Sequence, residues 1–210
     1  LTRMENAKDA AQALVDELRD VDRVGLAVFS WEDPARNRYE DTGHLERDLS
    51  FNHVPTYDRV EDLQDQFYTG GTNIGGGLRA GLDVFLNDPV PRPLPAPTDP
   101  EVVDVMVLLT DGQVNLPEPY PTSVDEFGVL PPPPYPKKPK YKDDVAVTKW
   151  ANTIKARGIK LHIVTLGSSA DSPLMVNAAS PDEGGTTYYH HVANGGSDAN
   201  ELLNVYKTIG

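Results

Sequence analysis

The stretch VVDVMVLLTDG, residues 102–112, decides the fold of this chain. Its first nine residues are almost all apolar, which is typical of a strand that is buried on both faces of a sheet. The Asp-Gly pair that follows predicts a turn directly after the strand. Because a strand without a polar face needs helices on both sides of its sheet, this stretch favours an α/β protein.

Strands and helices alternate along the rest of the chain. Apolar runs predict strands at 23–30, 159–167 and 186–192, and a hairpin arm or edge strand at 44–51. Apolar residues at helical spacing predict helices at 4–18, 59–67, 74–86, 143–158, 172–180 and 198–210. This order predicts an α/β fold with a doubly wound, mostly parallel sheet flanked by helices.

The domain organisation follows from the same pattern. One domain over residues 1–210 is the simplest arrangement, because no internal repeat is visible. Residues 87–100 contain six prolines and predict an extended connector. Residues 116–142, which are rich in proline and tyrosine, predict an irregular surface insertion near the carboxyl edge of the sheet. Its tyrosines are candidate partner contacts: Tyr120, Tyr135 and Tyr141.

Composition excludes several classes of function. The formal net charge of −13 argues against a nucleic-acid partner, because phosphate contacts need clustered Lys and Arg. The chain has no cysteine, which excludes disulfides, thiolate zinc sites and cysteine nucleophiles. No apolar run approaches the roughly 18 residues of a membrane span. No Ser/His/Asp set stands at a recognisable spacing, so we expect a protein that is not an enzyme.

Three histidines are expected to have structural roles. His162 alternates with apolar neighbours in a predicted strand, which indicates a packed side chain. His190 and His191 are adjacent in another predicted strand, so their side chains should point to opposite faces. The two rings therefore cannot chelate one metal well.

A second stretch, FYTGGTNIGGGLRAGL (67–82), has five glycines within eight residues before a helical pattern. It lacks the lysine of a P-loop, and a helix precedes it, which excludes the usual dinucleotide fingerprint. Two interpretations remain. The glycines allow a tight turn and close helix packing, or the loop presents Thr72 to a metal at the carboxyl edge of the sheet. Asp111 follows the strand 102–110 at the same edge, and a hydroxyl with a carboxylate suits a hard cation such as Mg²⁺.

Together, and in this order, the two loops resemble the metal-ion-dependent adhesion site of the von Willebrand factor type A family. That site combines Asp-x-Ser-x-Ser, a threonine in a glycine-rich loop, and an aspartate before glycine. Thr72 in TGGTNIGGGL matches the second loop, and Asp111 in LLTDGQ matches the third. Gly71, Asn73 and Gly112 would support these loops. The resemblance covers nearly the whole chain and implies Mg²⁺, or Mn²⁺ or Ca²⁺ in its place.

The resemblance implies a non-enzymatic adhesion or protein-binding module, in which an ion joins protein oxygens to a carboxylate of a protein or cell-surface ligand. The end of the chain, residues 174–210, is similar to the close of the type A domain in bacterial tight-adherence (Flp-type) pilus assembly proteins. It implies a bacterial surface or extracellular location. Two alternatives remain open. One is a scaffold subunit of a surface filament or envelope assembly with a vestigial metal site. The other is a type A domain of a metal-chelatase or ATPase-associated complex.

One part of the family pattern is missing from these 210 residues. No Asp-x-Ser-x-Ser occurs, although the helix at 4–18 resembles the family's first helix, which follows that motif. In the family, the first strand lies between those that correspond to 23–30 and 102–110. Without it, two rows of backbone groups would be unpaired. We expect this central place to be filled by a segment upstream of Leu1 or by a strand of another chain, and cation binding to be weak without it.

Overall fold

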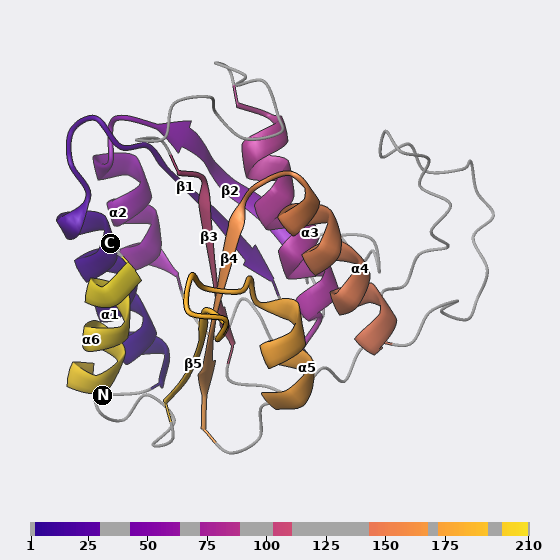
Figure 1. Ribbon diagram of the computed structural model, residues 1–210. Helices are drawn as coiled ribbons and strands as arrows, with labels where there is room; N and C mark the ends of the chain where they lie inside the picture. The colour runs from indigo at the N-terminus through magenta and orange to yellow at the C-terminus, as the bar shows by residue number, and fades with distance from the viewer. Residues whose placement is uncertain are drawn as a thin grey trace.

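The computed structural model describes residues 3–29, 43–63, 72–88, 103–110, 143–167, 172–192 and 199–209. Figure 1 shows an α/β arrangement, with strands between two groups of helices. The helices are α1 (Arg3–Glu17), α2 (Val54–Asp62), α3 (Ile74–Leu86), α4 (Asp143–Ala156), α5 (Ser172–Ala178) and α6 (Ala199–Ile209). The strands are β1 (Val24–Phe29), β2 (Gly43–Ser50), β3 (Val105–Thr110), β4 (Lys160–Leu166) and β5 (Tyr189–Val192).

A parallel sheet is formed by β3, β4 and β5, in that order. Val107 of β3 lies opposite His162 of β4, and Ile163 of β4 lies opposite Tyr189 of β5. Helices α1 and α6 lie on one side of these strands, and α3, α4 and α5 lie on the other (Figure 1). The predicted α/β class, with a parallel sheet flanked by helices, is confirmed.

Two apolar cores stabilise this arrangement, one on each face of the parallel sheet. The larger core joins β3 and β4 to α3, α4 and α5, and its fully buried members include Ile74, Leu78, Val147, Ile154, Leu161, Ile163 and Met175. The smaller core joins β4 and β5 to α1 and α6, through Ala10, Val164, Leu166, Val192, Leu202 and Tyr206. Alternate residues of β4 therefore point into different cores, as a strand with two covered faces requires.

β1 and β2 form a separate antiparallel pair, which confirms that the stretch 44–51 is a hairpin arm. The register shifts twice, on either side of Leu26, so the pairing is irregular there. Helix α3 packs against β1, β2 and β3. Among the described residues, neither β1 nor β2 is hydrogen-bonded to the parallel sheet. The two sheets are thus held together by helix packing.

Helix α2 corrects the prediction of a helix at 59–67. It begins at Val54, because Pro55 in its first turn has a φ that suits a helix and lacks an N–H that this turn would leave unbonded. It ends at Asp62. Pro55 is itself a local signal of a helix start, because proline is favoured in the first turn of a helix.

The last strand is shorter than the predicted 186–192. β5 begins at Tyr189, and Thr187 instead forms an isolated antiparallel bridge with Pro181. This bridge closes the turn that follows α5, so the chain reaches the sheet edge only afterwards.

Two predicted segments lie outside the described residues. They are the insertion at 116–142, with its three tyrosines, and the proline-rich connector beyond residue 88. Of the helices that are described, none combines the length and the apolar character needed to cross a membrane.

Candidate functional site

Thr72 and Asn73 lead directly into α3. Asn73 is the N-cap residue, and its Oδ1 accepts a hydrogen bond from the backbone N–H of Gly76 at 2.8 Å. Asn73 is 1% exposed, whereas Thr72 is half-buried. The cap satisfies one of the helix's unpaired N–H groups and fixes the chain just before the first turn. It therefore sets the position of Thr72.

Glycines in the first turns of α3 allow the helix to pack unusually close to its neighbours. A Cβ on Gly75 would lie 2.9 Å from the Cβ of Ala146 on α4. A Cβ on Gly77 would lie 2.6 Å from the ring of Phe29 on β1. The close-packing interpretation is confirmed for these two glycines. It is compatible with a metal-binding role for Thr72, because the packing fixes the helix that carries the loop.

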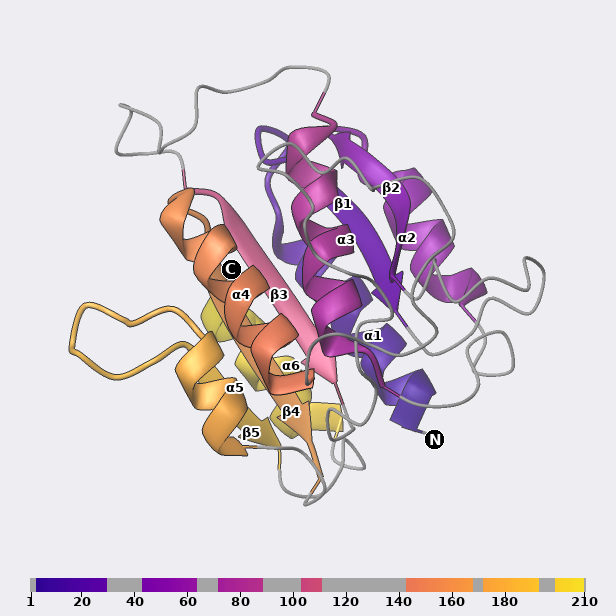
Figure 2. The same cartoon turned by 90° about the vertical axis from the view of Figure 1, so that its right-hand side faces the viewer.

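The start of α3 and the end of β3 lie at the same edge of the molecule. Figure 2 shows that α1, α3 and α4 all begin near the end at which the β3 arrow terminates. Thr110, the last residue of β3, is 5% exposed and pairs in register with Thr165 of β4. The start of α3, which directly follows Thr72 and Asn73 in the chain, thus lies at the carboxyl edge of the sheet. Asp111 follows Thr110 in the chain but lies outside the described residues, so its role as a ligand stays a prediction.

The ligand atoms available at this edge of the sheet determine which ion it could bind. Gly71 and Gly112, like Asp111, lie outside the described residues. Across the part of the chain that the structure describes, no group of three or more His, Asp or Glu side chains could hold a metal ion. A threonine hydroxyl and an aspartate carboxylate are hard oxygen donors that fit Mg²⁺, but two donors fall short of its about six ligands. The residues at hand therefore fit the class of ion and supply only part of its coordination.

A network of hydroxyl groups and one imidazole adjoins this edge on β4 and β5. Thr165 Oγ1 lies 2.9 Å from the Tyr189 hydroxyl and 3.1 Å from Nδ1 of His191. Thr165 is fully buried, and His191 is exposed. The strand registers place Thr110, Thr165 and His191 in one row across the sheet. Sequence reasoning missed this row, because no local signal reveals which residues of distant strands face one another.

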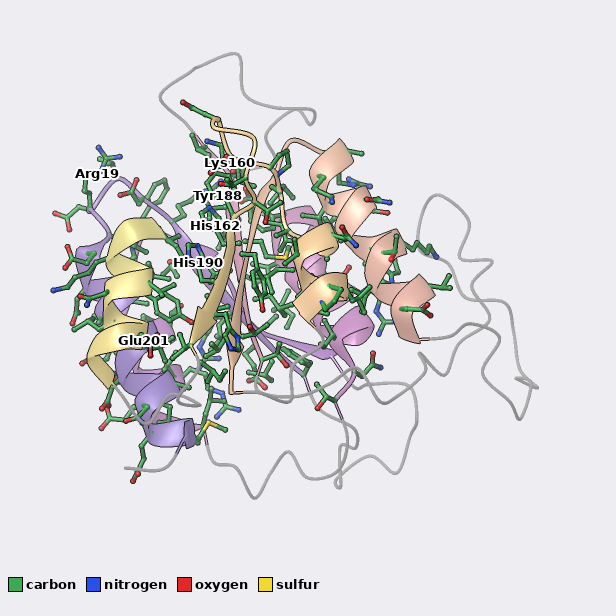
Figure 3. The ribbon with its side chains drawn as sticks, turned by 60° about the horizontal axis from the view of Figure 1, so that its bottom comes forward. Arg19, Lys160, His162, Tyr188, His190 and Glu201 are labelled. Carbon is green, nitrogen blue, oxygen red and sulfur yellow. The ribbon has the colours of Figure 1, made fainter. Side chains whose placement is uncertain are left out.

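His162 and His190 lie on the opposite face from His191, as predicted for neighbouring strand positions. His162 is 6% exposed and stacks on Tyr188 with ring centroids 4.2 Å apart, which confirms its packed role. Figure 3 shows Lys160, Tyr188, His162 and His190 following one another along this face. Burial, with smaller contributions from the charges of His190 and Lys160, lowers the pKa of His162 to about 4.

The two rings are held as neutral side chains. Burial also lowers the pKa of His190. Nδ1 of His162 and Nε2 of His190 are buried and meet no hydrogen-bond partner within the described ranges. Because an unpaired buried ring nitrogen tolerates charge poorly, these histidines serve packing at neutral pH.

Comparisons with known proteins agree with this geometry. A family model described as "von Willebrand factor type A domain" matches residues 1–129. No curated protein sequence matches the chain.

Several solved structures share the fold. Proximal thread matrix protein 1 from the mussel byssus, with a zinc-occupied MIDAS motif, aligns with a TM-score of 0.60 and 16% identity over 99% of this chain and 42% of that chain. Manganese-loaded Plasmodium vivax TRAP protein aligns with a TM-score of 0.55 and 17% identity, over 96% of this chain and 64% of that chain. The pilus adhesin SpaC from Lactobacillus rhamnosus GG aligns with a TM-score of 0.61 and 18% identity, over 99% of this chain and 28% of that chain. The chain therefore spans less than two thirds of each of these proteins.

Proposed function

Because the chain belongs to the von Willebrand factor type A domain family, we propose that it is a non-enzymatic binding module whose ligand is held through a divalent cation. Thr72 would supply a hydroxyl oxygen and Asp111 a carboxylate oxygen to Mg²⁺, Mn²⁺ or Ca²⁺. The bound ion would act as a Lewis acid for a carboxylate presented by a protein or cell-surface ligand. The observation that supports the proposal is the position of the start of α3, which directly follows Thr72 and Asn73 in the chain, at the edge of the molecule where β3 ends.

The chain's own residues would prepare this loop for binding. The Asn73 cap holds the turn that carries Thr72, and close packing at Gly75 and Gly77 holds α3 against α4 and β1. A site fixed before the ion arrives loses less conformational entropy on binding. Gly71 and Gly112 would let the two loop backbones approach each other.

The similar structures support a divalent cation. The mussel protein has zinc in its MIDAS motif, and the TRAP protein is loaded with manganese. We place the remaining oxygen ligands on a strand between β1 and β3, supplied by an upstream segment or by another chain. Until that strand is present, cation binding should be weak.

A bacterial surface or pilus-associated setting is the more specific form of the proposal. It is favoured by the end of the chain and by the likeness to a pilus adhesin. A scaffold subunit with a vestigial metal site is the second candidate, because no group of three or more ligating side chains gathers within the described residues.

Titration calorimetry with Mg²⁺ and Mn²⁺ tests the proposed function. We expect the 210-residue chain to bind with a dissociation constant of about 1 mM or weaker, and the polypeptide extended upstream to bind more tightly. Asp111→Ala and Thr72→Val should abolish binding, whereas Asp104→Asn, at the other end of β3, should not. Tight binding by the 210-residue chain alone would contradict the shortage of ligands. An extended protein that is indifferent to Asp111→Ala would favour the scaffold role.

A further inference from the structure

Large apolar side chains are exposed at the amino edge, which is the edge of the molecule opposite to the one where β3 ends. β1 and β3 both start there, because their arrows point the same way in Figure 2. Within the described ranges, five of the six large apolar side chains that are exposed precede β1 or β3, follow β2, or end α3: Val21, Phe51, Val54, Leu86 and Val103. Single apolar side chains are normal on a surface, whereas a cluster indicates a site of interaction.

Three of these side chains lie on two stretches of chain that are bonded to each other, and we name them the amino-edge patch: Val21 (68% exposed), Phe51 (57%) and Val54 (61%). His53 Nε2 donates to the backbone carbonyl oxygen of Asp22 at 2.9 Å, which joins the stretch before α2 to the stretch before β1. In the upper left of Figure 1, the link from α1 to β1 lies beside the link from β2 to α2. The patch is therefore assembled from segments about 30 residues apart, and no local sequence signal reveals it.

A buried ion pair holds the patch in place. The guanidinium of Arg23 lies 5.6 Å from the centroid of the Phe51 ring, and its Nη1 donates to Asp88 Oδ1 at 2.6 Å. Arg23 and Asp88 are 8% and 5% exposed at the side chain, so this support lies beneath the surface. A surface that is already fixed loses little conformational entropy when a partner binds.

Carboxylates border the apolar side chains. Asp20 directly precedes Val21 in the chain, and Asp58 follows Val54 by four positions on α2, so it lies on the same face of that helix. Both carboxylates are exposed, and neither has an ion-pair partner within the described residues. A partner for this surface needs apolar groups flanked by positive charge.

Nearby basic side chains do not cancel this acidity. Arg19 is paired with Asp22 at 3.0 Å. Arg47 donates to the carbonyl oxygen of Pro55 at 3.1 Å and is followed in the chain by the exposed Asp48. Among the described residues, the border of the amino-edge patch therefore carries a net negative charge.

The chain itself contains a stretch with the complementary composition. Residues 135–142, YPKKPKYK, contain two tyrosines and four of the chain's 19 Lys and Arg residues. Proline-rich peptides dock on surfaces that present aromatic side chains, and neighbouring charges fix their orientation. The amino-edge patch offers the Phe51 ring together with the carboxylates of Asp20 and Asp58.

The two complementary parts belong to opposite ends of the molecule. Lys142 directly precedes α4, which begins at the carboxyl edge (Figure 2), whereas the patch lies at the amino edge. α3, with its 13 residues, runs between these edges over about 20 Å. When different surfaces of identical copies bind each other, the contact repeats from copy to copy and forms an open chain unless the rotation closes a ring.

We infer that the amino-edge patch binds residues 135–142 of a second copy of this chain, so that copies associate head to tail. The lysines would meet Asp20 and Asp58, and the tyrosines would cover Val21, Phe51 and Val54. This contact needs no cation and does not depend on the proposed function. Because the patch is small, we expect a dissociation constant of about 100 µM.

Sedimentation velocity of the 210-residue chain in EDTA, from about 10 µM to 1 mM, tests the inference. We expect the average mass to rise with concentration beyond that of a dimer, and to fall when salt is raised from about 0.05 M to 0.5 M. Phe51→Ser and, separately, Asp58→Lys should each weaken association at least about tenfold. Val145→Ser, which removes the exposed apolar side chain outside this edge, is the matched control and should change nothing. Urea unfolding checks that each variant is folded.

A mixing experiment tests the head-to-tail arrangement. One variant has the patch substitution Phe51→Ser, and the other has glutamate in place of Lys137, Lys138, Lys140 and Lys142. Each variant alone should stay monomeric, while the mixture should form a 1:1 complex and nothing larger, because each protein keeps one functional end. A wild-type chain that stays monomeric up to 1 mM would overturn the inference. Association that survives both sets of substitutions would also overturn it, since contacts elsewhere, such as the open edges of β1 and β3, would then be responsible.

Discussion

Gly77 of α3 lies so close to Phe29 of β1 that a Cβ at position 77 would be 2.6 Å from atoms of the phenyl ring. The atoms in question are Cγ and Cδ1, near the root of the side chain, so the ring cannot easily move away. This contact holds the separate β1–β2 pair against the helix that also packs on β3. Glycine at this position is therefore part of what joins the two sheets.

We predict that Gly77→Ala lowers the free energy of unfolding by about 1–2 kcal/mol, because overpacking exceeds the gain of about 1 kcal/mol in helix propensity. Gly81→Ala is the matched control, since the atoms nearest to its Cβ would be Sδ and Cε of Met106, at 3.0 and 3.1 Å. A flexible thioether can adjust, so this control should be near neutral. Urea unfolding measures both, and equal losses in the two variants would contradict the explanation.

The Asn73 cap gives a second prediction, which concerns both stability and the site. Asn73→Ala should lower the free energy of unfolding by about 1–2 kcal/mol, because the N–H of Gly76 loses its acceptor. It should also weaken cation binding by the extended protein, because Thr72 precedes the cap. Asn73→Ser can still accept the hydrogen bond and should recover most of both properties. If Ser recovers stability but not cation binding, the cap does not position Thr72.

Much of this fold follows from local sequence patterns. The apolar run of β3 and the helical spacing of α3 are visible in the sequence, because burial on a strand or helix constrains side chains at a fixed period. The separation of β1 from the parallel sheet agrees with the resemblance, which places another strand between the stretches that form β1 and β3. Thr72 could be located because glycines and a cap residue mark a helix start.

Other features depend on contacts between distant residues. The row of Thr110, Thr165 and His191 arises from strand registers, which pair residues far apart in sequence. Arg23 and Asp88, which are 65 positions apart in the sequence, form an ion pair through tertiary packing. Neither residue stands out locally, because Asp88 lies beside a proline-rich stretch that favours an exposed connector. Its burial is decided by tertiary packing alone.

The Arg23–Asp88 pair carries the third prediction. Arg23 Nη1 donates to Asp88 Oδ1 at 2.6 Å, and the two side chains are 8% and 5% exposed. Asp88→Ala should therefore lower the free energy of unfolding by about 3–5 kcal/mol, because it leaves a buried guanidinium without its carboxylate. Arg19→Ala is the control. It breaks the ion pair between Asp22 and Arg19, whose side chain is 74% exposed, and should lower the free energy of unfolding by less than about 1 kcal/mol.

A double-mutant cycle separates this pairing from general packing. Replacing both residues, as Arg23→Leu with Asp88→Leu, should cost less than Asp88→Ala alone, because no charge is then left unpaired. Additive losses in urea unfolding would show that the two side chains act independently.

The fourth prediction is a loss of stability in mild acid that depends on His162. Burial lowers its pKa to about 4 in the folded chain, whereas an unfolded histidine has a pKa of about 6.5. Between these values the unfolded state binds the extra proton, so stability falls as the pH decreases from about 6.5 toward 4. Full protonation of this residue in the unfolded state would lower the free energy of unfolding by about 3 kcal/mol.

His162→Phe keeps an aromatic ring against Tyr188 but cannot be protonated, so it should reduce the slope of unfolding free energy against pH in this window. Urea unfolding of both proteins from pH 7 to pH 4.5 measures the difference, in which groups common to both cancel. Parallel profiles would show that the folded chain accommodates a charged His162.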